Sequence, residues 1–205
     1  MYKSQIKDNG CIATGKHFPG HGDTGIDSHN ALPVFEHGQE RLQDIGLVQF
    51  QAAIDAGMRA IMTAHIAVPD LSQDRLPATL TEKVLTDLLR TQLGFEGIVF
   101  TDAMDMGAVT RTFPDGEASV MAVLAGADVI LMPSNVGEAI ESIVAAVESG
   151  RLTEGRSESS VKKILQLKEE MGLHRERRVD VNKVPSVVGI PAHKEVAQTV
   201  ADRSV

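Results

Sequence analysis

The amino-acid sequence predicts an α/β fold built on a parallel β-sheet. Four short apolar runs alternate with amphipathic stretches of helical period. The runs lie roughly 30 to 50 residues apart, which leaves room for a loop and a crossover helix between successive strands. Polar residues gather directly after the runs, at the strand ends where (β/α)8 barrels keep their chemistry. We therefore expect four βα units, half of an eight-unit TIM barrel.

The expected strands are short and continuously apolar, as is typical of strands covered on both faces. They span Cys11–Thr14, Ala60–Ile66, Gly97–Met104 and Asp128–Pro133. An open doubly wound sheet would also hold ligands at its carboxyl ends, but in a single crevice. Because polar residues follow several strands here, the pattern favours a barrel.

Each strand is followed by a stretch with apolar residues at helical spacing, and glycines close several of these stretches. Thr79 and Glu82 have the spacing of a capping box at the start of one helix. In the final helix, Val161, Ile164, Leu165 and Met171 are expected to face inward. The expected helices are Arg41–Ala56, Glu82–Leu93, Ala118–Ala125, Glu138–Ser149 and Ser157–Met171.

The composition changes near the C-terminus. Residues 174–185 are charged and lack a helical period, which indicates a linker. The last twenty or so residues end in a short amphipathic helix with Val196, Ala197, Val200 and Ala201, and they are too few to bury a core. We expect a partial barrel over residues 1–155, a terminal helix and linker over 156–184, and over 185–205 a part of something larger.

Composition excludes several classes of function. The 205 residues include 20 basic and 28 acidic side chains, a net charge of −8, which disfavours binding to nucleic acid. Aromatic residues make up 3% and tryptophan is absent, so stacking of bases is also disfavoured. No apolar run reaches the length of a transmembrane helix. The single cysteine, Cys11, leaves both a cytoplasmic and a secreted location open.

The densest polar segment is the stretch from Gly15 to Pro33. It admits three interpretations: a solvated loop, a metal site, or a proton-transfer site. The Phe18-Pro19-Gly20 spacer cannot be a helix interior, which disfavours a metal site on one helix face. Asp27 and His29 are two residues apart, so an extended segment would place both side chains on one side, where the carboxylate raises the pKa of the imidazole. The polar candidates are Lys16, His17, His21, Asp23, Asp27 and His29.

A second polar centre follows the third predicted strand. Asp102 comes directly after apolar residues, and a carboxylate at the carboxyl end of a barrel strand indicates catalysis or ligand binding. The alternative is a helix N-cap, a role that suits Asp105 better. His65 also ends a strand and is a candidate supporting group. A histidine paired with an aspartate, opposite a separate carboxylate, predicts a hydrolase or transferase without choosing the bond.

Two motifs resemble glycoside hydrolase family 3, in its β-N-acetylglucosaminidase branch. They are KHFPGHGDTGIDSHNALP and GIVFTDAMDMGAV, and MTAHI, LPATLT and SVKKILQLKEEMGL are also similar to the family pattern. The resemblance covers about Gly10 to Val205. It implies an eight-stranded barrel, of which this chain shows the last four strands, the C-terminal half. It also implies that residues 185–205 are the start of a truncated second α/β domain, which some members have, and that the chain is an internal fragment.

The resemblance also implies roles for individual residues. Asp102 matches the nucleophile, and His29 with Asp27 matches the acid/base pair. Lys16 and His17 match residues that hold sugar hydroxyls. Met106 matches a position near the sugar.

The implied reaction removes terminal β-linked N-acetylglucosamine from glycans or peptidoglycan fragments with retained configuration, without metal or cofactor. Three alternatives stay open at this point. They are a metal-dependent barrel enzyme of the amidohydrolase kind that uses the histidine cluster, a truncated module without catalysis, and phosphorolysis in place of hydrolysis. The isolated chain is expected to have little or no activity.

Overall fold

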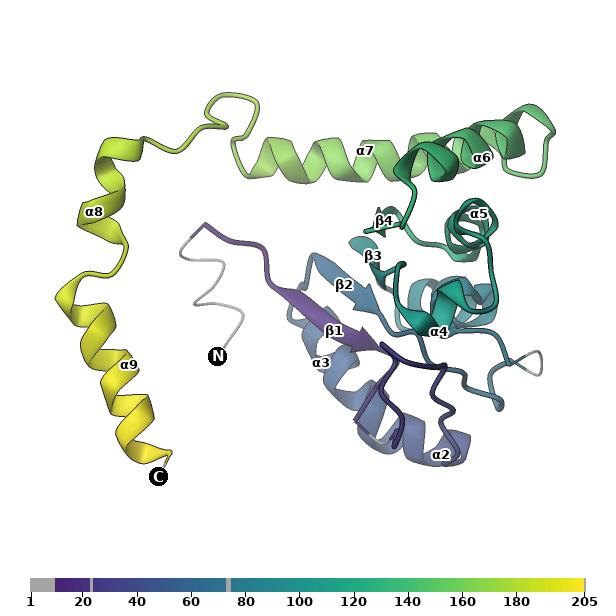
Figure 1. The fold of residues 1–205 in the computed structure, drawn as a ribbon, viewed down its shortest axis with the longest axis horizontal. Helices are drawn as coiled ribbons and strands as arrows, with labels where there is room; N and C mark the ends of the chain where they lie inside the picture. The colour runs from purple at the N-terminus through teal and green to yellow at the C-terminus, as the bar shows by residue number, and fades with distance from the viewer. Residues whose placement is uncertain (1–9, 23, 73–74, 205) are drawn as a thin grey trace. The chain divides into compact units, whose positions relative to one another are not determined.

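The computed structural model describes residues 10–22, 24–72 and 75–204 (Figure 1). The chain divides into two compact units, Met1–Leu167 and Lys168–Val205, which are described separately. The first unit contains the β-sheet and the polar motifs. The proposed domain boundaries at residues 155 and 184 remain an interpretation of the sequence.

The sheet of the first unit is parallel throughout its described strands. β1 (Thr14–Phe18), β2 (Ala60–Thr63), β3 (Ile98–Ala103) and β4 (Val129–Leu131) lie in the order β1-β2-β3-β4. The prediction of an α/β fold with a parallel sheet is therefore confirmed. Because all four strands run the same way, their carboxyl ends meet at one edge, which we call the carboxyl edge.

The first strand lies further along the chain than the sequence predicts. The prediction of a strand over Cys11–Thr14 is wrong, since β1 begins at Thr14 and Cys11 is exposed. Thr14 pairs with Ala60 of β2, and Phe18, which is fully buried, pairs with Thr63. The polar pair after Gly15 obscures the strand in the sequence, because a strand end at the carboxyl edge tolerates polar side chains.

Helices follow each strand of the first unit. After β1 come α2 (Gln39–Arg41), the π-helical η1 (Leu42–Leu47) and α3 (Val48–Asp55). After β2 come the 3-10 turn η2 (Ala78–Leu80) and the π-helical η3 (Lys83–Gln92). After β3 come α4 (Gly107–Thr110) and α5 (Asp115–Ala125), and after β4 come α6 (Val136–Glu148) and α7 (Glu154–Glu170).

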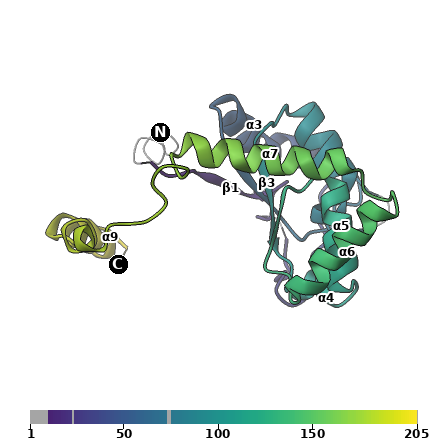
Figure 2. The same cartoon turned by 90° about the horizontal axis from the view of Figure 1, so that it is seen from above.

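The apolar core lies between the sheet and the helices that cover it. Figure 2 shows α5 and α6 side by side, and the two helices pack against each other. A smaller cluster of Val120, Ala146 and Leu152 joins α5, α6 and the turn before α7. Among the described residues, the largest fully buried apolar side chains are Phe18, Leu42, Ile61, Ile66, Val84, Leu85, Leu89, Phe95, Val99, Met104 and Leu152.

Three details differ from the sequence prediction. Thr79 does not cap a helix, because it is wholly buried within η2 and the N-cap of η3 makes no side-chain hydrogen bond. Asp105 is no cap either, since Met106 holds that position before α4. On α7, Val161 and Leu165 are more than half exposed rather than inward. The apolar face of α7 that carries these two residues is therefore not fully covered by the elements that pack against it.

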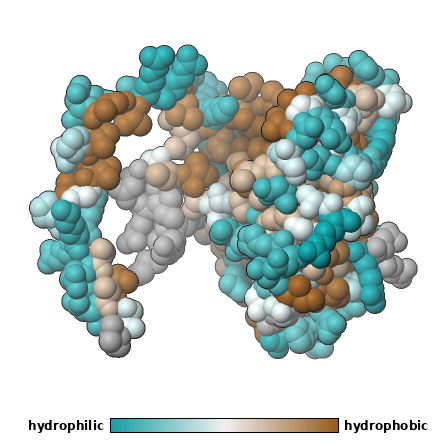
Figure 3. Space-filling model, in the orientation of Figure 1, coloured by the Kyte–Doolittle hydropathy of each residue, from teal (hydrophilic) through white to brown (hydrophobic). Residues whose placement is uncertain are grey.

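The second unit is helical. It contains η4 (Val181–Lys183), α8 (Val184–Val187) and α9 (Pro191–Arg203), so the expected short helix at the C-terminus is present. Figure 3 shows apolar surface along the part of this unit that includes α8. Its large exposed apolar side chains, among the described residues, are Leu173, Val179, Val181, Val184, Val187, Val188, Val196 and Val200. In the described part of either unit, no helix is long and apolar enough to cross a bilayer.

Candidate active site

The carboxyl edge brings the two polar motifs together. Lys16 and His17 lie in β1, and Asp102 lies near the end of β3, two strands away. Nε2 of His17 is 3.5 Å from Oδ2 of Asp102, across the end of β2. Lys16 is exposed, so its ammonium group is accessible to a ligand at this edge.

The two oxygens of Asp102 have different surroundings. Oδ1 accepts a hydrogen bond of 2.9 Å from the backbone N–H of Ala103, while Oδ2 faces His17. The Asp102 side chain is 17% exposed and that of His17 is 28% exposed, so both can be reached from solvent. Burial lowers the pKa of His17, although the charge of Asp102 opposes the effect. A neutral imidazole therefore stands beside a carboxylate with one free oxygen.

Asp27 and His29 form a hydrogen-bonded pair. Nδ1 of His29 lies 2.7 Å from Oδ1 of Asp27, and the same oxygen accepts the backbone N–H of His29 at 3.0 Å. The backbone between them turns rather than extends, since the N–H of Asn30 donates to the Asp27 carbonyl. The side chain of Asp27 thus builds the turn that presents His29. The expectation of an extended segment is wrong, although the two residues do meet.

The pairing changes the acid–base properties of both groups. The hydrogen bond to Asp27 raises the pKa of His29, and the charges of Asp27, Asp102 and Asp105 add to the effect. The backbone N–H and the ring of His29 lower the pKa of Asp27. Because Nδ1 is occupied by Asp27, Nε2 is the nitrogen of His29 that is left to exchange a proton with a ligand.

The loop that carries this pair docks on the start of α4. The carbonyl of His29 accepts a hydrogen bond of 3.1 Å from the N–H of Gly107, and the carbonyl of Ser28 accepts one of 3.2 Å from Ala108. A Cβ at Gly107 would stand 2.8 Å from the His29 carbonyl oxygen, so a glycine is required for this approach. These contacts place Asp27 and His29 at the same edge as Asp102.

The remaining histidine of the loop supports the backbone. Nε2 of His21 lies 3.0 Å from Oγ of the buried Ser28, and Nδ1 lies 2.8 Å from Oγ1 of Thr24. Asp23, a candidate ligand in the metal interpretation, lies outside the described residues. Among the residues that the structure describes, no group of three His, Cys, Asp or Glu side chains could hold a metal ion.

Two other sequence candidates are buried. Met106 is 6% exposed and presents little surface to a ligand. His65, directly after β2, is fully buried and lies 2.9 Å from the carbonyl oxygen of Ala103 through Nε2. The sequence does not predict its second partner, Thr79, as a site residue, because the local pattern indicates a helix cap. The sequence does not predict Gly107 as a site residue either, although a glycine next to a polar strand end is a signal of close backbone approach.

Comparison with known proteins agrees with this arrangement. Residues 2–167 match the model of the N-terminal domain of glycosyl hydrolase family 3. The chain is 33% identical over 213 residues to a β-N-acetylglucosaminidase/β-glucosidase of Cellulomonas fimi, an alignment that covers all of this chain and 38% of that protein.

Solved structures give the same picture. A family 3 β-N-acetylglucosaminidase from Paenibacillus sp. str. FPU-7 is 43% identical, with a TM-score of 0.83 over 87% of this chain and 35% of that one. The β-glucoside phosphorylase BglX is 27% identical, with a TM-score of 0.91 over 98% of this chain and 37% of that one. The chain spans little more than a third of these proteins. Sequence match and fold together show that it belongs to glycosyl hydrolase family 3.

Proposed function

We propose that the chain carries the nucleophile and the acid/base pair of a retaining glycosidase that releases terminal β-linked N-acetylglucosamine. The observation that supports this most directly is the meeting of two different groups at the carboxyl edge. Asp102 keeps one carboxylate oxygen free, and His29 is held by Asp27 in a form that favours the cation. The choice of sugar follows the relatives, which are named β-N-acetylglucosaminidases.

The geometry supports a role for each atom in the first step. Oδ2 of Asp102 attacks the anomeric carbon and forms a glycosyl ester. His29 gives the proton on Nε2 to the departing glycosidic oxygen, while Asp27 stabilises the cation through Nδ1. His17 stands beside Asp102 and Lys16 precedes it in β1, and we assign both to holding the hydroxyls of the sugar. Peptidoglycan fragments are one natural source of such a sugar.

The second step reverses the proton transfer. The ring of His29, now neutral, takes a proton from water through Nε2 as the water attacks the anomeric carbon. The ester bond to Asp102 breaks, and the sugar leaves with its original configuration. Asp102 and His29 then return to their starting states, so the cycle balances without a metal or a cofactor.

Aryl β-N-acetylglucosaminides with good and poor leaving groups test this assignment in the full-length protein. Asp102→Gly is expected to abolish turnover of every substrate. His29→Ala is expected to cost roughly 10²–10⁴-fold with a poor leaving group and much less with a good one, because a good leaving group needs no proton. His193→Ala, on the exposed surface of α9, is the control. An equal loss for both leaving groups would remove His29 from the acid role.

We further propose that the chain supplies the last four βα units of an eight-unit barrel. The chain covers 38% of the Cellulomonas fimi protein, and Ile140, Val144, Val161 and Leu165 leave apolar surface on α6 and α7 that further units would cover. On this proposal the 205 residues alone turn over little or no aryl β-N-acetylglucosaminide. Robust turnover by the purified 205-residue chain would contradict it.

Phosphorolysis is a second candidate, because the chain resembles the β-glucoside phosphorylase BglX over 98% of its length. In the second step the imidazole of His29 is neutral, so it does not repel an incoming phosphate as a carboxylate in the same place would. If phosphate replaces water in the second step, the product is a sugar 1-phosphate. Product analysis with and without inorganic phosphate separates the two reactions.

A further inference from the structure

His65 is a buried polar residue that the proposed mechanism does not use. It follows β2 directly, its side chain is 0% exposed, and both ring nitrogens have partners. Nε2 lies 2.9 Å from the carbonyl oxygen of Ala103, and Nδ1 lies 2.9 Å from Oγ1 of Thr79. A fully buried imidazole with two defined partners is held in one orientation, so it can hold its neighbours in turn.

The chemistry of the partners determines the direction of these hydrogen bonds. The Ala103 carbonyl only accepts, so Nε2 of His65 carries the proton. Burial lowers the pKa of His65, so at neutral pH the ring is neutral and Nδ1 is an acceptor. The donor within its reach is the Thr79 hydroxyl, whose one proton is also directed at the carbonyl oxygen of Ala64, 3.0 Å away. Thr63 lies 2.7 Å from Oγ1 of Thr79 and can donate to it in turn. A chain of donors therefore runs from Thr63 through Thr79 and His65 to Ala103.

The Ala103 carbonyl lies where the ladder of backbone pairs ends. β2 and β3 pair from Ala60 with Ile98 as far as Met62 with Phe100, and the register of β3 against β4 shifts between Phe100 and Ala103. The hydrogen bond from His65 thus holds the end of β3, beyond the last backbone pair with β2. The same residue, Ala103, donates its N–H to Oδ1 of Asp102.

We propose that His65 is a positioning residue for Asp102. Its Nε2–H fixes the Ala103 carbonyl, the Ala103 N–H fixes Oδ1, and Oδ2 is thereby aimed at the anomeric carbon. This inference rests on the proposed function, because it assumes that Asp102 is the nucleophile. It extends that function to a residue and a hydrogen-bonded chain that lie outside the reach of the substrate.

A pair of amide variants tests the proposal in the full-length protein. His65→Gln can place an N–H near the position of Nε2, whereas His65→Asn has an amide too short to reach the Ala103 carbonyl. With an aryl substrate that has a good leaving group, His65→Asn is expected to lower kcat roughly 10- to 100-fold with little change in KM. His65→Gln is expected to recover most of the loss. Thr79→Val, which removes the donor to Nδ1, is expected to fall between the two.

The results separate this inference from the proposed function. If Asp102→Gly does not affect turnover, the assignment of the nucleophile fails. If Asp102→Gly is inactive but His65→Asn and His65→Gln have equal kcat, the positioning role of His65 is overturned. A loss that appears only as a raised KM also overturns it, because misaiming of Oδ2 slows the chemical step. Far-UV circular dichroism checks that each variant is folded, and His193→Asn is the control.

Discussion

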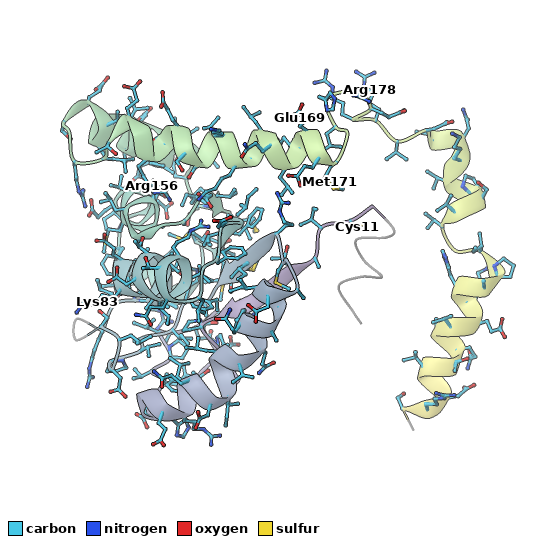
Figure 4. The ribbon with its side chains drawn as sticks, turned by 180° about the vertical axis from the view of Figure 1, so that it is seen from behind. Cys11, Lys83, Arg156, Glu169, Met171 and Arg178 are labelled. Atoms are coloured by element: carbon cyan, nitrogen blue, oxygen red, sulfur yellow. The ribbon has the colours of Figure 1, made fainter. Side chains whose placement is uncertain are left out.

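Replacing Asp128 with asparagine removes a charge that the fold buries at the end of the sheet opposite the site. Asp128 directly precedes β4, and its side chain is 0% exposed. Arg90 lies 2.6 Å away, Lys163 lies 3.5 Å away and Arg156 lies 3.6 Å away. Figure 4 shows Arg156 on the side of α7 that faces the rest of the first unit. The cluster therefore ties η3 and α7 to the strands.

The size of the effect follows from this burial. Removing one partner of a buried ion cluster costs about 3–5 kcal/mol, because the remaining charges lose their counterion away from water. At an m-value of about 2 kcal/mol/M, the urea midpoint falls by about 1.5–2.5 M. The neutral amide would also be a weaker partner for Ser160 and for the N–H of Val99, which both bind the carboxylate of Asp128.

Urea denaturation followed by far-UV circular dichroism measures the change, since the chain has no tryptophan. Glu117→Gln is the matched control, because its pair with Arg151 is 41–46% exposed and contributes at most about 1 kcal/mol. A midpoint for Asp128→Asn no lower than that of Glu117→Gln would refute the reasoning. The kcat of folded Asp128→Asn is expected to be unchanged, because the cluster lies away from the carboxyl edge.

The same cluster predicts a pH dependence of stability. Burial alone would raise the pKa of Asp128, but Arg90, Ser160, the Val99 N–H and Lys163 together hold it below its ordinary value. A carboxyl group whose pKa is lower in the folded state stabilises the fold above its unfolded pKa of about 3.9, and this contribution is lost as the pH falls through the folded pKa. Asp128→Asn is therefore expected to flatten the acid limb of a stability–pH curve.

Two further substitutions address the site itself. Gly107→Ala places a methyl group 2.8 Å from the His29 carbonyl oxygen and so displaces the loop that carries Asp27 and His29. In the full-length protein this change is expected to lower kcat by roughly 10²-fold, which steady-state kinetics check. Gly155→Ala, with open space around it, is the control. Lys16→Met removes the exposed cation that precedes His17 in β1, and in the full-length protein it is expected to raise KM for the sugar more than it lowers kcat. An unchanged KM would exclude Lys16 from binding.

The residues at the carboxyl edge could be predicted from the sequence, because the patterns that indicate them lie within short segments of the chain. Alternation of apolar runs with helical stretches indicates a parallel sheet, and polar residues after those runs indicate the edge. The spacing of Asp27 and His29 predicts their pairing for the wrong reason, since the Asp27 side chain folds the backbone into a turn. The polar pair Lys16 and His17 hides the true limits of β1, because strand patterns are recognised by apolar residues.

The support around Asp102 could not be predicted, because it depends on contacts between distant parts of the chain. Thr79 and His65 are 14 residues apart, and His65 and Ala103 are 38 apart. In the sequence, Thr79 has the spacing of a helix cap, and that local pattern conceals a buried hydroxyl. Asp128 is a similar case, since three cations from η3 and α7 gather on it only after the sheet has formed.

Asp27 and His29 are exposed, unlike the buried residues that support Asp102, and this difference has a measurable consequence. Asp27 and His29 are 61% and 75% exposed, so water and salt reach both. The hydrogen bond and the charge of Asp27 raise the pKa of His29, which keeps the proton donor available to higher pH. If His29 is the acid, the alkaline limb of kcat/KM in the full-length protein is therefore expected to lie above the ordinary imidazole value of about 6.5. Asp27→Asn keeps an acceptor for Nδ1 but removes the charge, so the limb is expected to move to lower pH.

Salt offers an independent test of the same pair. The Debye length falls from about 10 Å at 0.1 M to about 3 Å at 1 M, which screens exposed charges. High salt is therefore expected to move the alkaline limb of the wild type to lower pH, and to move that of Asp27→Asn less. If Asp27→Asn leaves the limb in place at low salt, Asp27 does not set the pKa of His29. If salt shifts both proteins equally, the screened charge belongs to Asp102 or Asp105, which also raise that pKa.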